Sequence, residues 1–338
     1  MIARDHSPAT VAITGSSGLI GSALQAALRA KGHTVVRISR SGVGAGAGSR
    51  SRSATRHGKV EEETGGLRVV DRQGSQIDAS WDIHAGRLPK EIFAGAGAVV
   101  HLAGAGIGDN RWTEARKKEI LESRTLSTEL MASTLAALDD PPAVFLSASA
   151  IGYYGNRGSE VLTEDSPGGT GFLAGVCEAW EAATAPAEKA GIRVVLLRTG
   201  IVQSPLGGML KRLIPLFRIG LGSYLGDGRQ YMSWISIADE VRAIEHAISH
   251  ASLSGPVNLC SPNPVTAADY ARSVAAVVGR HARLHVPAAV LRAAAGSEMA
   301  SELLLSSQRA LPAKLEATGF TFKWADLEEA LANLLAGS

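Results

Sequence analysis

Three glycines at three-residue intervals, Gly15, Gly18 and Gly21, separate an apolar run from an amphipathic stretch near the start of the chain. The run, residues 11–14, predicts a short strand, and the stretch, residues 19–30, predicts a helix that begins in the glycine turn. A strand that passes through a tight turn directly into a helix is typical of the first unit of a parallel α/β sheet. This junction therefore constrains the fold more than any other feature of the sequence.

The same alternation of strand and helix patterns continues over the first two hundred residues. Further strands are predicted over residues 34–38, 98–102, 143–147 and 193–197. Long helices are predicted over residues 113–138 and 173–190, and Pro186 should kink or split the second. Because the strands are apolar throughout, both faces of their sheet must be covered by helices. The predicted fold class is α/β, a Rossmann-type doubly wound parallel sheet with a smaller C-terminal substrate lobe.

The later part of the chain is looser and rich in Gly and Pro, with helices expected near residues 238–249, 267–279 and 327–335. We predict a Rossmann domain over residues 1–203 and a C-terminal lobe over residues 204–338, from which residues 235–260 return to the first domain. A flexible insertion is expected at about residues 41–80, because its low-complexity part has little to bury. Its basic residues would suit a nucleic-acid arm, but the acidic run at residues 61–63 favours a solvated loop.

Composition argues against several classes of partner. The 34 Lys and Arg residues against 32 Asp and Glu give a net charge of +2, which does not favour binding to nucleic acid. No apolar run approaches the roughly 20 residues that span a bilayer, and the first residues lack the apolar stretch of a signal peptide. Two cysteines, Cys177 and Cys260, suit a reducing compartment. We expect a cytoplasmic monomer or homodimer that acts on a small molecule, with no membrane or nucleic-acid partner.

The glycine turn predicts a dinucleotide-binding site. Gly15 permits the tight turn, Gly18 lets backbone N–H groups approach a pyrophosphate, and Gly21 allows the helix to pack closely on the strand. The helix N-terminus adds free N–H donors and the positive end of its dipole. The predicted cofactor contacts in this turn are Gly15, Ser17, Gly18, Leu19, Ile20 and Gly21.

The end of the second strand indicates which dinucleotide is bound. A carboxylate about 20 residues past the turn would accept the ribose 2′-hydroxyl of NAD, whereas an Arg accommodates the 2′-phosphate of NADP. No Asp or Glu occurs between Gly21 and Glu61, and the strand ends in Ser39 and Arg40. We therefore predict NADP(H) as the cofactor, with Ser39 and Arg40 in contact with it. The alternative is that Arg40 merely begins the basic insertion.

Longer segments carry a family resemblance. TGSSGLIG (14–21), VVHLAGAGIGDNRWTEARKKEILESR (99–124) and SASAIGYYGNRG (147–158) resemble the extended short-chain dehydrogenase/reductases. More narrowly, the chain is similar to the epimerase-family proteins labelled nucleoside-diphosphate-sugar epimerases, as FLAGVCEAWEAA (172–183), VVLLRTGIV (194–202), GDGRQYMSWI (226–235) and SELLLSSQRALPAKLEATGF (301–320) also show. The resemblance covers nearly the whole chain outside residues 41–80.

This resemblance implies an NADP-carrying Rossmann domain and a C-terminal lobe that closes over a substrate cleft. It places His101–Gly104 at the end of the fourth strand, along the nicotinamide-side ribose, so that Leu102, Ala103 and Gly104 become cofactor contacts. Arg124 stands where the family usually has Asn. It is assigned to the cofactor site, while a contact with a substrate phosphate and an ion pair with Glu181 remain open.

The sequence departs from the family at its catalytic pair. The usual Tyr-x-x-x-Lys uses Tyr as the acid/base and Lys to lower its pKa, but Leu173 and Cys177 occupy those positions. In one hypothesis Tyr153 or Tyr154 replaces the lost acid/base, and Ser149 positions the substrate oxygen. In the other, the protein binds NADP as a sensor or regulator without efficient turnover. Cys177 is interpreted as a core residue rather than a nucleophile.

Two further groups complete the predicted site residues. Arg229, in a glycine-containing turn, is assigned to substrate phosphate by the resemblance, against the alternative of a plain β-turn with a surface Arg. His246 and His250 have the spacing of a metal pair, but no third ligand accompanies them, so we predict a surface helix and no metal. The function predicted is an NADP-binding epimerase-like or oxidoreductase-like enzyme for a small polar substrate such as a nucleotide sugar.

Overall fold

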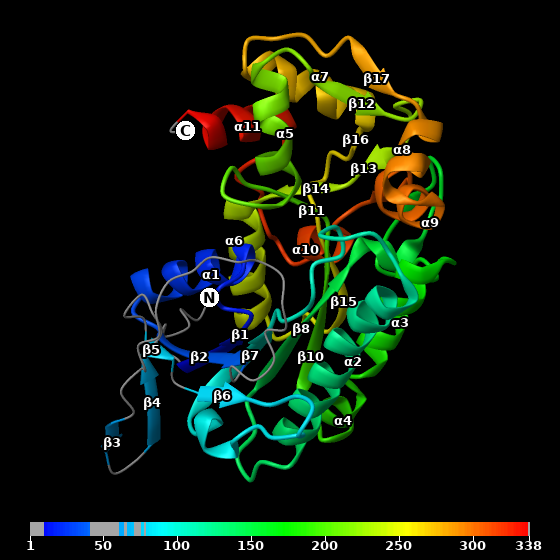
Figure 1. Ribbon diagram of the computed structural model, residues 1–338. Helices are drawn as coiled ribbons and strands as arrows, with labels where there is room; N and C mark the ends of the chain where they lie inside the picture. Colours follow the sequence, from blue (N-terminus) through cyan, green and yellow to red (C-terminus); the bar gives the residue numbers. More distant parts are fainter. Residues whose placement is uncertain (1–9, 41–60, 64–65, 71–75, 78, 337–338) are drawn as a thin grey trace.

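A computed structural model describes residues 10–40, 61–63, 66–70, 76–77 and 79–336 of the chain (Figure 1). Its centre is a parallel sheet in the order β15-β10-β8-β7-β1-β2-β6. The seven strands are β1 (Thr10–Thr14), β2 (Thr34–Arg40), β6 (Ala79–Trp81), β7 (Ala96–His101), β8 (Val144–Ala150), β10 (Arg193–Thr199) and β15 (Gly255–Leu259). Strand order reverses between β1 and β7, which is where doubly wound sheets bind their ligands. The predicted fold class is confirmed.

Helices cover both faces of this sheet. On one face α1 (Leu19–Ala30) and α6 (Ile237–Ser249) pack on the apolar strands through Leu24, Leu28 and Ile244. On the other face lie α2 (Glu114–Ala136), α3 (Phe172–Ala182) and α4 (Ala185–Lys189). The helix predicted over residues 173–190 is split as expected, and Pro186 stands in the first turn of α4. Proline is tolerated there because the N–H groups of a first turn have no acceptor within the helix.

A second apolar cluster lies beyond the carboxyl edge of the sheet (Figure 1). It joins α5 (Gly208–Arg218), α7 (Ala267–Val277) and α11 (Leu327–Leu335) around Trp234 and Tyr270. Further elements are β9 (Val161–Leu162), β11 (Ile201–Gln203), β12 (Ser223–Leu225), β13 (Tyr231–Met232), β14 (Trp234–Ser236), β16 (Val265–Thr266), β17 (Leu284–Val286), α8 (Ala288–Ala295), α9 (Ser297–Met299), η3 (Ala300–Leu304), β18 (Arg309–Ala310) and α10 (Ala313–Ala317). Of these, α10 packs on β15 of the central sheet. The domain boundary at residue 203 stays a prediction.

The predicted insertion needs one correction. Residues 79–81 form β6, which pairs with β2 at the edge of the central sheet, so the insertion expected as far as residue 80 overlaps a core strand. The strand was missed because its three residues are too few to show a period. Before it come β3 (Glu61–Glu63), β4 (Gly66–Val70) and β5 (Gln76–Ile77), which pair in antiparallel fashion. The low-complexity stretch 41–59 lies outside the described residues. In the described part of the chain, every helix is too short or too polar to cross a membrane.

Candidate functional site

The six residues predicted to hold the pyrophosphate lie together where β1 ends and α1 begins. Gly15 has φ 65°, and a Cβ there would lie 2.7 Å from the carbonyl carbon of Leu102. A Cβ at Gly21 would lie 2.3 Å from the carbonyl oxygen of Gly15, so the helix could not approach the strand. Gly18 differs, because its φ is −75° and a Cβ would meet the Gly15 oxygen at 3.2 Å. The fold itself demands Gly15 and Gly21 far more strictly than Gly18.

The N-terminus of α1 is left open. Gly18 is the N-cap and provides no side-chain hydrogen bond, and the first turn carries no acidic residue. By contrast, Thr113 caps α2, Ser236 caps α6 and Thr266 caps α7 through side-chain oxygens. Because Ser17 and Gly18 are exposed, the first N–H groups of α1 face solvent and can receive an external anion.

The end of β2 lies beside this turn. The pairing of β1 with β2 ends at Thr14 and Ile38, so Ser39 extends one residue past β1 and is half-buried. Arg37 is buried and directs its Nε to the Ser16 hydroxyl at 3.4 Å. Arg40 ends β2, and its side chain lies outside the described part of the structure. The described side chains at this strand end are thus neutral or positive, as a phosphate requires.

The end of β7 is fixed by a buried histidine. His101 Nδ1 lies 2.7 Å from the Thr14 hydroxyl, and its Nε2 lies 3.1 Å from the Ser127 hydroxyl. Burial lowers the pKa of His101 to about 3, so the ring is neutral. The amide of Leu102 also donates to the Thr14 hydroxyl, at 3.2 Å. Leu102, Ala103 and the exposed Gly104 are thereby held beside the glycine turn, at the point where strand order reverses.

Arg124 lies between the β7 end and α3. Its Nη1 donates to the Ile120 carbonyl at 3.0 Å, and its Cζ lies 5.0 Å from the centre of the Trp180 ring. A Cβ at Gly104 would lie 3.4 Å from the same Cζ. Glu181 forms its ion pair with another arginine, so the pairing of Arg124 with Glu181 considered from the sequence is wrong.

Leu173 and Cys177, which the sequence resemblance puts at the positions of the family's catalytic pair, lie beside the loop after β8. A Cβ at Gly152 would lie 3.8 Å from Leu173 Cβ and 3.7 Å from Cys177 Sγ. Cys177 is 4% exposed, and burial raises the pKa of its thiol to about 12. A thiol protonated at neutral pH is a poor nucleophile, which supports the interpretation of Cys177 as a core residue.

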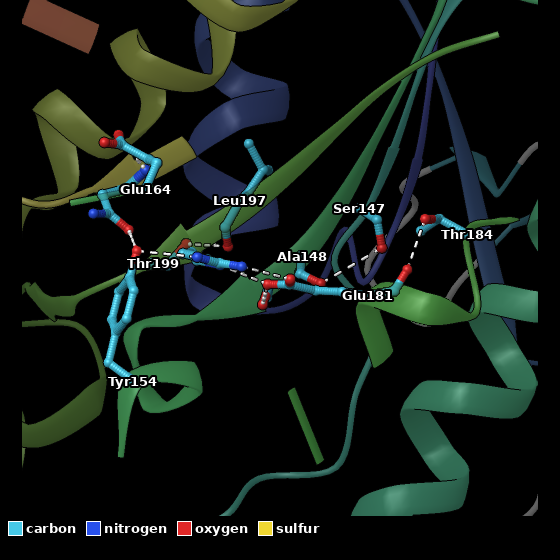
Figure 2. A network of polar contacts seen from close by, with 11 residues as sticks. Ser147, Ala148, Tyr154, Glu164, Glu181, Thr184, Leu197 and Thr199 are labelled. Atoms are coloured by element: carbon cyan, nitrogen blue, oxygen red, sulfur yellow. Dashed lines mark hydrogen bonds and ion pairs between the residues drawn. The ribbon is translucent and has the colours of Figure 1, made fainter. Parts of the chain in front are cut away.

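Two of the three predicted catalytic side chains, Ser149 and Tyr154, belong to a buried polar network. Figure 2 labels Tyr154 and Glu181 in this network. Ser149 Oγ donates to Glu181 at 2.6 Å, and Arg198 holds both oxygens of that carboxylate at 2.8 Å. Arg198 also donates to the Tyr154 hydroxyl at 3.1 Å, which in turn donates to Asn258 Oδ1 at 2.7 Å. Tyr154 is fully buried, and this burial raises its pKa to about 12. The geometry therefore favours a positioning role for Ser149 and Tyr154, whose catalytic assignment stays a prediction.

Tyr153 is the half-buried member of the three. The guanidinium of Arg198 lies 3.5 Å from its ring centre, and its ring meets the Tyr154 ring edge to face. A Cβ at Gly168 would lie 3.1 Å from its Cζ. Contacts with Arg198 and Tyr154 thus fix the position of the Tyr153 ring, which stays partly exposed to solvent.

A pocket of about 150 Å³ lies between the loop after β8, the start of α3 and the C-terminal segment. Its walls are Gly152, Gly155, Asn156, Thr170, Leu173, Ala174, Ser301, Glu302, Ser306 and Gln308. Glu302 also accepts hydrogen bonds from the backbone N–H of Phe172 at 2.9 Å and of Leu173 at 2.8 Å. Its carboxylate therefore caps α3 from the other end of the chain.

The sequence did not reveal the C-terminal wall of this pocket. Residues 301–320 counted toward the family resemblance, but no local pattern indicates that Glu302 meets a helix 129 residues earlier. Arg229, the predicted substrate contact, is exposed and is not among the pocket residues. Its turn does pack against the same segment, since a Cβ at Gly226 would lie 2.7 Å from Leu305 Cδ2. Its contact with substrate stays a prediction.

The histidine pair lies on α6, away from these groups. His246 Nε2 lies 2.9 Å from the Thr318 hydroxyl, and its ring stacks on His250 with centroids 4.1 Å apart. Among the described residues, no group of three or more His, Cys, Asp or Glu side chains could hold a metal. Half-burial of both rings makes this helix face an interface with the C-terminal segment rather than a free surface.

The open glycine turn, the parallel sheet and the site at its carboxyl edge define a nucleotide-binding α/β protein of the doubly wound class. The chain belongs to the NAD dependent epimerase/dehydratase family, whose profile matches residues 11–260. Residues 286–334, which contribute Glu302 to the pocket, match a domain of unknown function, DUF1731. The family resemblance seen in the sequence is therefore confirmed.

Relatives align over nearly the full chain. An epimerase family protein of Mycobacterium bovis is 46% identical over 323 residues, which is 96% of each chain. The human epimerase family protein SDR39U1, solved with NADPH, is 29% identical with a TM-score of 0.80, covering 97% of this chain and all of that one (100%). A nucleoside-diphosphate sugar epimerase from Corynebacterium glutamicum is 37% identical with a TM-score of 0.73, covering 97% of this chain and 58% of that one.

Proposed function

We propose that the chain binds NADPH and acts as an epimerase-like or oxidoreductase-like enzyme on a small polar substrate such as a nucleotide sugar. The observation that carries this proposal is the open N-terminus of α1. Gly18 provides no side-chain acceptor for the first N–H groups of this helix, whereas side chains cap the corresponding groups of α2 and α6. The human relative solved with NADPH supports the same cofactor for this chain.

The residues present fit NADPH on three counts. The turn from Ser17 to Gly21 would hold the pyrophosphate, because Ser17 and Gly18 are exposed and no acidic side chain stands in the first turn of α1. Ser39 and Arg40 would hold the 2′-phosphate. Residues 102–104 would lie along the nicotinamide-side ribose, next to the point where strand order reverses. When bound, NADPH supplies a hydride.

The chain's own groups divide the remaining work. Arg198 and Glu181 keep Ser149 and Tyr154 in place, and the raised pKa of Tyr154 keeps its phenol neutral. We assign proton transfer to Tyr153, since it alone of the three is half-buried rather than buried. Leu173 and the C-terminal segment around Glu302 line the pocket that we assign to the substrate.

One observation favours a second function. Leu173 cannot move a proton and the Cys177 thiol is held neutral, so the pair that the family uses for chemistry is absent. A protein that binds NADPH with its catalytic end altered in this way could sense the cofactor rather than turn it over. Single-turnover assays of bound NADPH against a panel of carbonyl compounds and nucleotide sugars separate the two functions. Oxidation at useful rates by any of them would exclude the sensor.

Cofactor binding is tested by Gly18→Asp, titrated with NADPH by fluorescence. Asp is a good N-cap and the φ of Gly18 suits it, so α1 should keep its stability. Its carboxylate would take the N–H groups and repel the pyrophosphate, so we expect the Kd for NADPH to rise about 100-fold or more. Ala26→Asp, two turns further along the exposed face of α1, is the matched control and should bind normally. An unchanged Kd in Gly18→Asp would refute the assignment.

A further inference from the structure

We propose that Arg124 binds a carboxylate of the substrate. The inference rests on the proposed function and narrows its substrate class to small carboxylic acids, sugar acids included. It goes beyond the contact predicted from the sequence, which assigned Arg124 to the cofactor.

The charge of Arg124 lacks an anionic partner. Its contacts are the Ile120 carbonyl and the face of the Trp180 ring, and among the described residues no carboxylate forms an ion pair with it. Glu181, which follows Trp180 on α3, does not serve as this partner, because its carboxylate is bound by Arg198 and Ser149. Burial is the main cause that lowers the pKa of Arg124, and repulsion by Arg116 adds to it. A half-buried guanidinium with no anionic partner is stabilised by an external anion.

Arg124 lies beside Gly104, in the segment that follows β7 at the active-site edge of the sheet. Gly104, which is exposed, lies over the guanidinium, and a Cβ at that residue would approach Cζ to 3.4 Å and Nη2 to 3.5 Å. Because residue 104 is a glycine, no side chain of that residue covers this side of Arg124. Behind it, Trp180 supports the planar group, and the indole is itself fixed by a hydrogen bond from Nε1 to Thr128 at 2.9 Å. The guanidinium is thus oriented before any ligand arrives.

The cofactor's phosphates are accounted for elsewhere. In the strand order β2-β1-β7-β8, the pyrophosphate donors lie at the end of β1 and the 2′-phosphate residues at the end of β2. Arg124 lies on the other side, between the end of β7 and α3, and neighbouring strands are about 4.8 Å apart. An anion at Arg124 therefore belongs to the substrate. The flat, five-donor guanidinium matches a carboxylate in a bidentate pair.

The test measures binding of glycolate, its neutral analogue glycolamide and inorganic phosphate to the protein–NADPH complex by calorimetry. We expect glycolate to bind, glycolamide not to bind, and Arg124→Gln to weaken glycolate about 10- to 100-fold while the Kd for NADPH changes less than about 3-fold. Arg124→Lys keeps the positive charge but not the two parallel N–H donors of the guanidinium. Its affinity for glycolate should therefore lie between those of the wild type and Arg124→Gln. Lys118→Gln, an exposed change on the same helix, is the control, and melting temperatures verify that each variant folds.

Several results would overturn the proposal. Equal binding of glycolamide, a loss of NADPH affinity in Arg124→Gln as large as that of glycolate, or tighter binding of phosphate than of glycolate would each do so. If the wild-type protein fails to bind NADPH, the proposed function fails, and glycolate is titrated into the cofactor-free protein instead. A loss of glycolate binding in Arg124→Gln would then still support the carboxylate site, and its absence would overturn it.

Discussion

The two ends of the site are built in opposite ways. At the end formed by β1, α1 and β2, the turn from Gly15 to Gly21 has closely packed glycines and a helix N-terminus that no side chain caps. At the end formed by β8 and α3, the polar side chains bind groups of the chain itself. Glu181 is bound by Arg198 and Ser149, and Glu302 accepts a hydrogen bond from the first N–H group of α3. The first, which we call the open end, leaves its donors free for a ligand. At the second, which we call the closed end, the chain itself pairs these carboxylates, and the pocket of about 150 Å³ lies beside them.

This difference shows which part of the family's machinery the chain retains. Cofactor binding depends mainly on backbone N–H groups, which tolerate changes of side chain as long as the glycines remain. Proton transfer in the family depends on the identity of two side chains, and the sequence resemblance puts Leu173 and Cys177 at their positions in this chain. We therefore expect mutations at the closed end to change stability or ligand choice, and mutations at the open end to change cofactor affinity.

The largest expected effect comes from Glu181→Gln at the closed end. Arg198 is 4% exposed in its side chain, so the change leaves a buried guanidinium without its anion. Breaking a buried pair in this way costs about 3–5 kcal/mol of unfolding free energy. Denaturant unfolding measures it, and Glu178→Gln, an exposed residue one turn earlier on α3, should change little. A variant that loses NADPH affinity as severely as Gly18→Asp would show that the two ends are not independent.

A second effect on stability depends on pH and comes from Glu240 on α6. Glu240 is fully buried with Thr199 as donor to one of its oxygens, and burial raises its pKa from 4.5 to about 8. The folded state therefore holds a proton that the unfolded state releases, so this group's contribution is greatest below pH 4.5. It is lost as the pH rises to about 8, at roughly 1.4 kcal/mol per pH unit.

Unfolding measurements of the wild type and Glu240→Gln between pH 5 and pH 8 test this contribution. The neutral amide does not titrate, so the free energy of unfolding of the variant should fall less with rising pH than that of the wild type. Glu129→Gln, on the exposed side of α2, should follow the wild-type slope. Parallel curves for wild type and Glu240→Gln would show that Glu240 is ionised in the folded protein.

The open end is also the part that sequence predicts well. The glycine turn, α1 and the strand ending in Ser39 and Arg40 are contiguous, so their roles follow from local spacing and from the periodicity of apolar residues. The bounds of α1 agree with the prediction, and the split of the later helix at Pro186 follows from the chemistry of one residue. Interactions between residues close in the sequence determine the glycine turn, α1 and the helix break at Pro186, so local sequence patterns predict them.

The closed end shows where this reasoning stops. Ser149 and Glu181 are 32 residues apart, and Tyr154 meets Asn258 across 104 residues, with no sequence pattern that links them. The predicted catalytic role of Ser149 and Tyr154 came from the family resemblance and from their place at the end of a strand, which give the position but not the partners. Partners are set by which strands lie side by side, and here β8, β10 and β15 bring the three segments together.

A smaller effect is expected from Arg40→Glu at the open end. Loss of a charge-assisted contact with the 2′-phosphate is worth about 1.5–3 kcal/mol, and the new carboxylate adds repulsion. The ratio of the Kd for NADH to that for NADPH should therefore fall about 10- to 100-fold in competition titrations. Arg29→Glu, at the far end of α1, should leave the ratio unchanged. The same ratio in Arg40→Glu would remove Arg40 from the cofactor site.

The smallest effect is expected from Glu302→Gln, which separates capping from ligand contact at the closed end. The amide keeps one acceptor for the N–H groups of Phe172 and Leu173 but loses the charge that favours a helix N-terminus. A loss of about 1 kcal/mol in the free energy of unfolding is expected. Glu298→Gln, which removes an exposed ion pair with Lys117, is the matched control and should cost less.

The ligand measurements decide what Glu302 does beyond capping. If it only holds α3, glycolate should bind the Glu302→Gln complex with NADPH as tightly as the wild-type complex, because Arg124 is untouched. If its carboxylate also repels anions at the pocket wall, removing the charge should tighten glycolate binding without changing the Kd for NADPH. We expect the second result. Glu302 and Leu173 line the same pocket. Cys177, one helical turn after Leu173, interacts with Arg124. Unchanged glycolate affinity would limit Glu302 to its structural role.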